Sequence, residues 1–512
     1  MSLLAIDIGS SRCKGLLFSS DGKTLAQCTQ SYAPIFSRQS FAEMNPDTFL
    51  DAVTIVSRSI GSLQHRDAIE AVCLSSHGET LIPVNAAGEP LRSAILNMDN
   101  RAAEEAVWCE QQMGRKHLFE LTGLTSHAMY PVPKLLWLQK HEPQLFRDGS
   151  RFLSVISYIL SRLGLPPCID YSLASRFMAF DIRKKCWSKE ILSLLHLAED
   201  ALPIPVLAGT IAGELSPEAA RQLGLPSGAR MVVGGHDQAC GSIGAGAIAA
   251  GKVFDSMGTY ESIAATSDEP QISEGALNYS LNTYCHVLPE KFITLAYFPS
   301  GIMVQWFSDL LYPANAVAAS GRSEEANFSE LEMLAPAGPS GLLAVAHLIG
   351  TCNPDFNPNA RGAIVGLTAG SHRGHIYKGI LEGIACELST MTGIFERTLG
   401  HFTDIYATGG GTRSPLGMRL RAAMTERRFH LMSCAESVCL GGAILAGVAI
   451  GQYQNIGEAV RQMVHEEKVF EPDGELGRVY LPIQQGYAQL NCLLKTLECP
   501  NGNHTDGLGV KA

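Results

Sequence analysis

Two short apolar runs near the N-terminus are joined by a Gly-Ser-Ser step. The run LLAIDIG (3–9) contains a single carboxylate, Asp7, and the run KGLLFSS (14–20) follows it. Short apolar runs joined by turn residues predict a β-hairpin. An ionised aspartate in a buried strand costs several kcal/mol unless something pairs with it. The pattern therefore predicts a functional partner for Asp7.

The following segments alternate between helical and strand-like patterns. Residues 45–63 have helical periodicity, with Asn45 as the expected N-cap and Pro46 at the first helical position. The run AVCLSS (71–76) predicts a short buried strand. Residues 99–225 have mostly helical periodicity, interrupted by proline-rich breaks. The segment 232–251 then predicts a strand that ends in a turn and a helix rich in Gly and Ala.

A second pair of apolar runs, 252–270, repeats the plan of the first pair, because it too is a strand, a Gly-hydroxyl step and another strand. Such a repeat predicts a duplicated architecture with a related hairpin at the head of each half. We expect domains at 1–245 and 246–490. The last dozen residues are polar and Gly-rich, which predicts a loose tail over 491–512.

Composition narrows the class of protein. The 512 residues are 46% hydrophobic and 17% charged, which is typical of a soluble enzyme and not of a disordered chain. The net charge of −11 and the scattered basic residues argue against a nucleic-acid partner. The longest weakly polar stretch is interrupted by polar residues and rich in Gly, so no membrane span is expected. The 14 cysteines have irregular spacings, which favours reduced thiols in a cytoplasmic protein. The oligomeric state is left open, with a homodimer as one option.

The two expected hairpin tips have the composition of phosphate-binding loops. Gly9-Ser10-Ser11 exposes backbone N–H groups and hydroxyls, and Lys14 lies close enough to add positive charge. A plain turn is the commoner meaning of such a tripeptide. The second tip, Gly258-Thr259, favours the phosphate interpretation, because two such tips facing each other could hold a triphosphate from both sides.

Two carboxylates and a glycine cluster complete the candidate chemistry. Asp7 precedes the first tip, where it could hold Mg²⁺ through water. Asp237 ends a strand and precedes a helix, which suits either a general base or an N-cap. The glycines at 409–411 follow a strand and open a helix, without the spacing of a dinucleotide or P-loop motif. They suit close approach to a flat ligand such as adenine, or a simple turn.

With these features in place, the sequence resembles the FGGY family of carbohydrate kinases over residues 3–490. MYPVPKLLWLQKH (129–141) fits the first family signature at every constrained position, and residues 362–382 carry the second. Gly379 departs from the second signature, where the pattern asks for Ala or Ser. Further matches are IDIGSSRCK, SSHGET, ILNMDNR, GGHDQACGSIGAG, MGTYES, GIMVQW and GGGTRSPL. The resemblance implies an α/β fold of two duplicated actin-like (ribonuclease H-like) domains with a central cleft.

The resemblance also implies ATP and Mg²⁺ as cofactors, a small-molecule sugar as substrate, and a role for individual residues. Asp7 would serve the metal, and Asp237 would be the base that accepts the proton of the attacking hydroxyl. The residues implied in substrate binding are His77, Gly78, Glu79, Asp99, Arg101, Asp237 and Gln238. The residues implied in nucleotide binding are Ser10, Ser11, Lys14, Gly258, Thr259, Gly301, Gln305, Gly410, Gly411 and Ser414. The first domain would build the acceptor end, and the second would bind the nucleotide.

Departures from the family pattern concern the acceptor. Asn97-Met98 stands where many members have Trp, and 77–79 reads His-Gly-Glu, neither the Met-His-Gly associated with xylulose nor the Gln-Arg-Glu associated with glycerol. Tyr260-Glu261 is bulkier and more acidic than the usual pair. A ketose such as xylulose, or a related linear sugar, is favoured because the His-Gly pair and Asp237-Gln238 are kept. A glycerol- or erythritol-type polyol is the second candidate.

Two readings lie outside the sugar kinases. A chaperone- or filament-like ATPase would need no acceptor site, whereas Glu79, Asp99, Arg101 and Asp237 together resemble one. An inactive sensor that binds sugar and nucleotide would not need both Asp7 and Asp237.

Overall fold

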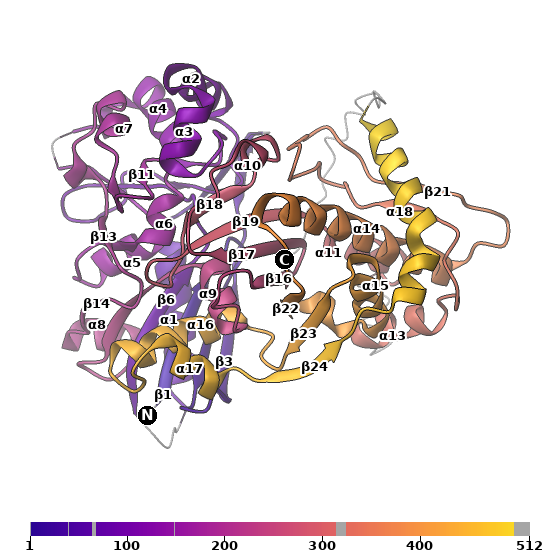
Figure 1. Cartoon of the computed structure of the whole chain (residues 1–512). Coiled ribbons are helices and arrows are strands. Elements are labelled where there is room, and N and C mark those ends of the chain that lie inside the picture. The colour runs from indigo at the N-terminus through magenta and orange to yellow at the C-terminus, as the bar shows by residue number, and fades with distance from the viewer. Residues whose placement is uncertain (1, 39, 64–67, 148, 314–323, 496–512) are drawn as a thin grey trace.

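The computed structural model describes residues 2–38, 40–63, 68–147, 149–313 and 324–495, which form two α/β halves, each built on a large twisted sheet (Figure 1). In the first sheet the strand order is β14-β15-β6-β1-β2-β3. Its strands are β1 (Ser2–Ile8), β2 (Arg12–Phe18), β3 (Thr24–Ser31), β6 (Ile69–Ser76), β14 (Ile211–Glu214) and β15 (Arg230–His236). Strand β1 pairs antiparallel with β2 and parallel with β6, so the predicted hairpin and the predicted buried strand are confirmed.

The second sheet repeats this plan, with the strand order β18-β19-β17-β16-β22-β23-β24. Its strands are β16 (Val253–Met257), β17 (Tyr260–Ser267), β18 (Asn282–Cys285), β19 (Phe292–Pro299), β22 (Asp404–Thr408), β23 (Arg428–Met432) and β24 (Glu466–Phe470). Strand β16 is antiparallel to β17 and parallel to β22, as β1 is to β2 and β6. The predicted duplication of the hairpin is therefore present in the fold.

Helices of the first half pack around its sheet, and several of them lie at the top of the view in Figure 1. They are α1 (Asp47–Gly61), α2 (Ala103–Met113), α3 (Arg115–Thr122), α4 (Pro131–His141), α5 (Val155–Arg162), α6 (Tyr171–Ser175), α7 (Lys189–Leu194), α8 (Pro217–Leu223) and the 3₁₀ turns η1 (Pro143–Leu145) and η2 (Glu199–Ala201). The expected cap of α1 is one residue off, because Pro46 occupies the N-cap position and the helix begins at Asp47. Asn45 still accepts a hydrogen bond from the Asp47 N–H through Oδ1, at 3.1 Å.

Short strands interrupt the region that the sequence predicts as mostly helical, and others flank it. They are β4 (Ile35–Arg38), β5 (Phe41–Met44), β7 (Ile82–Val84), β8 (Ala94–Ile95), β9 (Arg151–Leu153), β10 (Cys168–Asp170), β11 (Phe180–Asp181), β12 (Cys186–Trp187) and β13 (Ile204–Val206). They pair in sheets of two or three strands. A strand of two or three residues is too short to show a period along the chain, so periodicity alone misses it.

The second half carries its own helices and a small extra sheet. Helix α9 (Asp237–Gly244) ends the first half, and the elements of the second half are α10 (Glu274–Asn278), α11 (Gly301–Leu311), α13 (Glu324–Met333), β20 (Leu343–Val345), β21 (Ala363–Val365), α14 (Arg373–Leu399), η3 (Gly410–Arg413), α15 (Pro415–Thr425), α16 (Ser437–Ala449), α17 (Ile456–Met463) and α18 (Gly474–Leu494). Helix α18 continues into the segment predicted as a loose tail, of which residues 496–512 lie outside the described residues.

One apolar core is shared by the two halves. Helix α16 packs against β1 and β6 of the first sheet and against α9, and Figure 1 shows α16 and α17, in gold, beside the indigo strands. The helices α9 and α16 approach closely through glycines. A Cβ on Gly244 would lie 1.9 Å from the Ser437 carbonyl oxygen, and one on Gly441 would lie 1.9 Å from the Cys240 carbonyl oxygen. The chain thus returns to its first sheet after building the second.

None of the helices in the described residues combines the length and the apolar character needed to span a bilayer. The described cysteines are free thiols, as the irregular spacing predicts.

Candidate active site

A cavity of about 1200 Å³ lies between the two halves. From the first half it is lined by residues that the sequence singled out, namely Ser10, His77, Gly78, Glu79, Asp237 and Gln238. The second half adds residues that the sequence did not single out for the acceptor, among them Ser262, Tyr297, Thr351 and Phe356. Both halves therefore contribute to the wall of this cavity, and the division into an acceptor half and a nucleotide half stays a prediction.

Asp237 begins helix α9 at the carboxyl end of β15. Its side chain is 26% exposed, and its Oδ1 lies 2.6 Å from the Gln238 N–H, which donates to it, and 3.4 Å from His236 Nε2. Burial, together with the charges of Asp7 and Glu79, raises the pKa of this carboxyl to about 8, while the Gln238 hydrogen bond and the charge of Arg176 act in the opposite direction. A general base works best when its pKa lies near the operating pH. Asp237 has both the exposure and the proton affinity of such a base.

Glu79 is held rigidly beside Asp237 in the cavity wall. Its backbone has φ 64, a left-handed conformation that few residues other than glycine adopt. The buried Lys134 ammonium donates to the Glu79 carbonyl oxygen and to the Leu96 carbonyl oxygen, both at 2.8 Å, and Arg176 Nε donates to Glu79 Oε1 at 2.5 Å. Backbone strain of this kind persists where surrounding contacts enforce it and is concentrated at functional sites.

Arg176 is a site residue that sequence reasoning missed. It is 2% exposed, lines the cavity, and lies with its guanidinium 5.2 Å from the Tyr130 ring and 5.0 Å from the Tyr284 ring. Within the described residues its Nη1 has no hydrogen-bond partner. No local motif pointed to it, because its partner Glu79 lies 97 positions earlier in the chain. The free N–H group can donate to an oxygen of a ligand in the cavity.

Replacing Arg176 by Met is expected to lower kcat/KM about 10–100-fold and to lower the melting temperature. The variant leaves Glu79 as an uncompensated buried charge, which costs about 3–5 kcal/mol. The double variant Glu79→Gln/Arg176→Met should regain stability but not activity. Arg183→Met, at an arginine whose side chain is 58% exposed, is the matched control and should behave as wild type. Steady-state kinetics and thermal unfolding measure both effects, and normal activity of Arg176→Met would show that its guanidinium has no role at the site.

Asp99 and Arg101, which the sequence predicts as substrate contacts, do not line the cavity. Asp99 Oδ1 accepts from the backbone N–H and the Nε of Arg101, both at 2.9 Å, and Oδ2 accepts from Arg101 Nη2 at 2.8 Å and from the Ala42 N–H at 2.6 Å. Arg101 also binds Glu43, and its guanidinium lies 3.9 Å from the Phe41 ring. The hydrogen bonds of this pair fix the loop in this structure, and the predicted contact of Asp99 and Arg101 with the substrate stays a prediction.

Neighbours on that loop face the cavity instead. Asn97, Met98 and Asn100 line it, and Asn97 Oδ1 is buried without a hydrogen-bond partner among the described residues. Asn97 and Asn100 therefore make this part of the cavity wall polar.

The first hairpin tip and Asp7 lie near Asp237, because Ser10 lines the same cavity and the charge of Asp7 raises the pKa of Asp237. Asp7 faces Ser75 on β6, whose Oγ donates to Asp7 Oδ1 at 3.3 Å. Burial raises the pKa of Asp7 to about 7, against the charge of Lys14. Lys14 itself is paired with both carboxylate oxygens of Glu436, at 2.7 and 2.6 Å. Glu436 was not foreseen, because it lies 422 positions away.

The second hairpin tip is fixed on the start of helix α11. The Thr259 carbonyl oxygen accepts from the Ile302 N–H at 3.1 Å, and the Gly258 carbonyl oxygen accepts from the Gly301 N–H at 3.2 Å. A Cβ on residue 301 would lie 2.4 Å from the Gly258 carbonyl oxygen. Glycine at 301 therefore permits this close approach, independently of any contact with a nucleotide.

The acidic residue that follows this tip points away from the cleft. Glu261 is fully buried and binds Arg421 through two hydrogen bonds, at 3.0 and 2.6 Å, and Ser300 Oγ at 2.7 Å, whereas Tyr260 lines the cavity. Asp255, on β16, is also fully buried, and burial beside Glu261 raises its pKa well above the usual range. Asp255 lies three residues before Gly258, whereas Asp7 lies two residues before Gly9. Side chains alternate between the two faces of a strand, so Asp255 lies on the face opposite to the one that would match Asp7.

The remaining nucleotide candidates lie away from the cavity wall. Gly410 and Gly411 form the turn η3, Ser414 caps helix α15 by accepting from the Gly417 N–H at 3.0 Å, and Gln305 donates to Asp309 at 2.8 Å. The predicted strand, glycine turn and helix are confirmed. The adenosine contact of these residues stays a prediction, as does the role of Ser11 at the first tip.

Comparisons with known proteins point in one direction. Residues 2–244 match the FGGY family of carbohydrate kinases, N-terminal domain, and residues 256–450 match the C-terminal domain of the same family. The chain is 26% identical to the xylulose kinase of Bacillus subtilis (strain 168) over 97% of both chains. It is 27% identical to the gluconokinase of Bacillus licheniformis over 99% of both chains.

Solved structures agree on the fold. The ligand-bound xylulose kinase from Lactobacillus acidophilus has a TM-score of 0.86 at 24% identity and covers 96% of this chain, with 98% of its own chain covered. The glycerol kinase from Plasmodium falciparum with ADP has a TM-score of 0.83 at 17% identity, with 98% of both chains covered. The two-domain α/β fold expected from the sequence is thereby confirmed.

Proposed function

The chain belongs to the FGGY family of carbohydrate kinases, and on that premise we propose that it transfers the γ-phosphoryl group of ATP to a hydroxyl of an uncharged sugar, a ketose such as xylulose or a related linear sugar. The enzyme is a carbohydrate kinase, and its similarity to both a xylulose kinase and a gluconokinase leaves two acceptor classes. These differ in charge, since gluconate carries a carboxylate and xylulose does not.

The charge balance of the cavity wall is the observation that favours the neutral sugar. Both arginines that line the cavity face a carboxylate, Arg176 facing Glu79 at 2.5 Å and Arg115 facing Glu110 at 3.9 Å. Asp237 adds a further acid. The histidines that line it have pKa values lowered by burial and are therefore neutral near pH 7: His77, His127 and His236. The wall offers a carboxylate no unbalanced positive charge, and like charges in a buried site are costly.

The size of the cavity argues against the smallest polyols. A volume of about 1200 Å³ exceeds what a three-carbon polyol fills, even with part of it open towards the nucleotide side of the cleft. Small-molecule sites bury most of the ligand surface. A longer acceptor therefore fits better than glycerol.

The position of Asp237 in the cavity suits it to act as the base in phosphoryl transfer. Its carboxylate accepts the proton of the attacking hydroxyl, and the γ-phosphoryl group passes in line to the sugar oxygen. The N–H groups and hydroxyls of the two hairpin tips stabilise negative charge on the phosphate oxygens. Lys14 can join them only by leaving Glu436.

Asp7 fits the Mg²⁺ that such a reaction uses. Within the described residues its carboxylate accepts one long hydrogen bond, from Ser75 at 3.3 Å, and burial raises its pKa by more than the charge of Lys14 lowers it. Hard cations prefer carboxylate oxygen ligands. When bound, Mg²⁺ would neutralise charge on the β- and γ-phosphates.

The acceptor class is tested by ADP release with Mg·ATP and a panel of ketopentoses, ketohexoses, small polyols and gluconate. We expect kcat/KM for the best ketose to exceed that for gluconate at least tenfold, because a 1.4 kcal/mol penalty for the carboxylate is already a factor of ten. Gluconate as the best acceptor would contradict the charge argument. Free ATP hydrolysis with no acceptor turned over would contradict the proposed function itself.

A further inference from the structure

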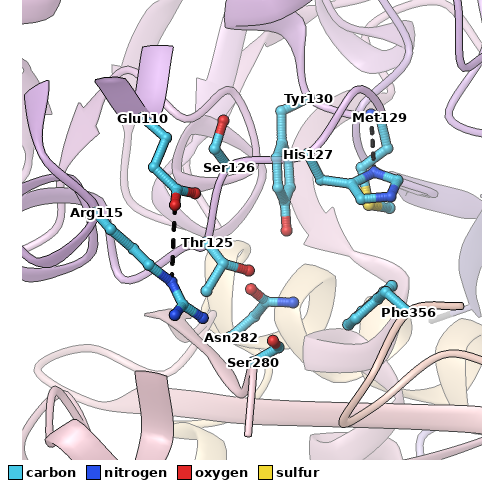
Figure 2. A pocket seen from close by; sticks show the side chains of 10 residues that line it. All are labelled: Glu110, Arg115, Thr125, Ser126, His127, Met129, Tyr130, Ser280, Asn282 and Phe356. Atoms are coloured by element: carbon cyan, nitrogen blue, oxygen red, sulfur yellow. Dashed lines mark hydrogen bonds and ion pairs between the residues drawn. The ribbon is translucent and has the colours of Figure 1, made fainter. Parts of the chain in front are cut away.

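A side pocket of about 180 Å³ lies beside the acceptor cavity, and Figure 2 shows the side chains that line it. Both spaces share His127, Met129 and Phe356 in their walls, so they are adjacent. Asp237 lines the large cavity but not the side pocket. The side pocket therefore lies at an end of the acceptor space that the reacting group does not reach.

The pocket lies at a fixed seam between the two halves. The loop that contains Thr125 comes from the first half, and Asn282, on β18, comes from the second. Next to the pocket, the Thr283 N–H donates to the Gly123 carbonyl oxygen at 2.9 Å, and Arg115 Nη2 donates to the Leu277 carbonyl oxygen at 3.3 Å. Contacts of this kind hold the two walls at a constant separation.

A buried polar atom in this pocket lacks a partner. Asn282 is 2% exposed, and its Oδ1 has no hydrogen-bond partner in the described part of the chain. Figure 2 shows its amide pointing into the pocket below the Tyr130 hydroxyl and beside Thr125. Leaving a buried acceptor unsatisfied costs about 1–3 kcal/mol, so a ligand hydroxyl that donates to it would bind favourably.

The remaining wall favours an uncharged, hydroxylated group. Thr125 and Ser280 present hydroxyl groups, and the Tyr130 and Phe356 rings offer flat apolar surface to the C–H faces of a sugar. Arg115 faces Glu110 across 3.9 Å, so the pocket has no unbalanced charge for an ionic group.

We propose that the side pocket is a distal acceptor subsite, in which Asn282 accepts a hydrogen bond from a hydroxyl at the end of the acceptor farthest from the reacting group. The acceptor that uses it is an uncharged sugar longer than five carbons, or a shorter one that carries an additional hydroxylated substituent. This proposal rests on the proposed function, and it adds the length of the substrate.

The test compares kcat/KM for ketoses of five, six and seven carbons in the wild type and in Asn282→Ala, measured by ADP release. We expect the longest acceptor to be the best, and Asn282→Ala to lower its kcat/KM about tenfold through KM, while the five-carbon ketose changes less than twofold. Tenfold corresponds to about 1.4 kcal/mol, the scale of one hydrogen bond. Thr125→Val, which removes a hydroxyl at constant volume, should give the same selective loss and serves if Asn282→Ala does not fold.

The matched control is Asn278→Ala, at an exposed position outside the pocket, and it should leave every acceptor unchanged. Equal kcat/KM for all lengths in the wild type, or a loss in Asn282→Ala and Thr125→Val that is the same for every length, would overturn the subsite while leaving the kinase assignment in place. Absence of turnover with every neutral sugar would instead overturn the proposed function, and the subsite with it.

Discussion

Asp237→Asn is expected to lower kcat by a factor of about 10²–10⁴ while the protein remains folded, because general-base catalysis contributes an acceleration of that size. The amide keeps the shape of the side chain but cannot accept the proton of the attacking hydroxyl. KM for the sugar should change little, since the rest of the cavity wall is intact. Steady-state rates of ADP release at saturating sugar and Mg·ATP determine kcat. A variant with normal kcat would rule out Asp237 as the base.

The same variant gives an independent signature in its stability. Because the pKa of Asp237 is raised from 3.8 to about 8, the native state retains a proton that the unfolded chain loses above pH 4. Native wild type therefore loses stability from this group as the pH rises from about 4 to 8. Asn does not ionise, so Asp237→Asn should match wild type at pH 4 and melt at a higher temperature at pH 8. If Asp237→Asn and wild type had the same melting temperature at pH 8 as well as at pH 4, the pKa of Asp237 would not be raised in the native state.

Asp7→Asn is expected to cost at least a hundredfold in Mg·ATP-dependent turnover, with the fold preserved. The variant removes the carboxylate that fits the metal, and electrostatic stabilisation of the transferred group is the largest contribution to this class of reaction. The loss should appear as a higher Mg²⁺ requirement and weaker nucleotide binding, with no change in sugar binding. Titrating Mg²⁺ at fixed ATP in steady-state assays separates these effects.

Asp255→Asn is the matched control for Asp7→Asn, because Asp255 occupies the related strand of the second hairpin but is fully buried away from the cleft. Its raised pKa means that the neutral Asn replaces a group that is already uncharged. It should keep the wild-type dependence on Mg²⁺. An unchanged Mg²⁺ dependence in Asp7→Asn would refute the role assigned to Asp7.

Local patterns in the sequence were sufficient for the main elements of both sheets. The hairpins β1–β2 and β16–β17 and the strand-to-helix step at Asp237 were predicted because each is encoded within about twenty consecutive residues. The strands β10 and β11 were missed, since a strand of two or three residues is too short to show a period. Strand β10 also depends on a tertiary contact, because it pairs with β13, which lies far along the chain, whereas β11 pairs with the nearby β12.

Some residues of the candidate site could likewise be predicted from local motifs, and others could not. Asp7, Glu79 and Asp237 were found because motifs mark them, whereas Arg176 and Asn282 became visible only once burial and unpaired atoms were known. The motif that marks Asp99 and Arg101 could not reveal that each satisfies the other behind the cavity wall. Side-chain packing decides which of several polar residues on one loop faces a ligand. A local sequence motif does not contain that information.

Helix α16, which covers part of the first sheet, has a consequence for how the protein is made on the ribosome. Leu3 and Ala5 of β1 share a core with Leu440 and Ile444 of α16. The roughly 200 residues between the end of β15 at His236 and the start of α16 at Ser437 take about 10–40 s to synthesise at ~5–20 residues per second. During that time the emerging first half presents an incompletely covered apolar face, which makes the nascent chain a natural client for chaperones.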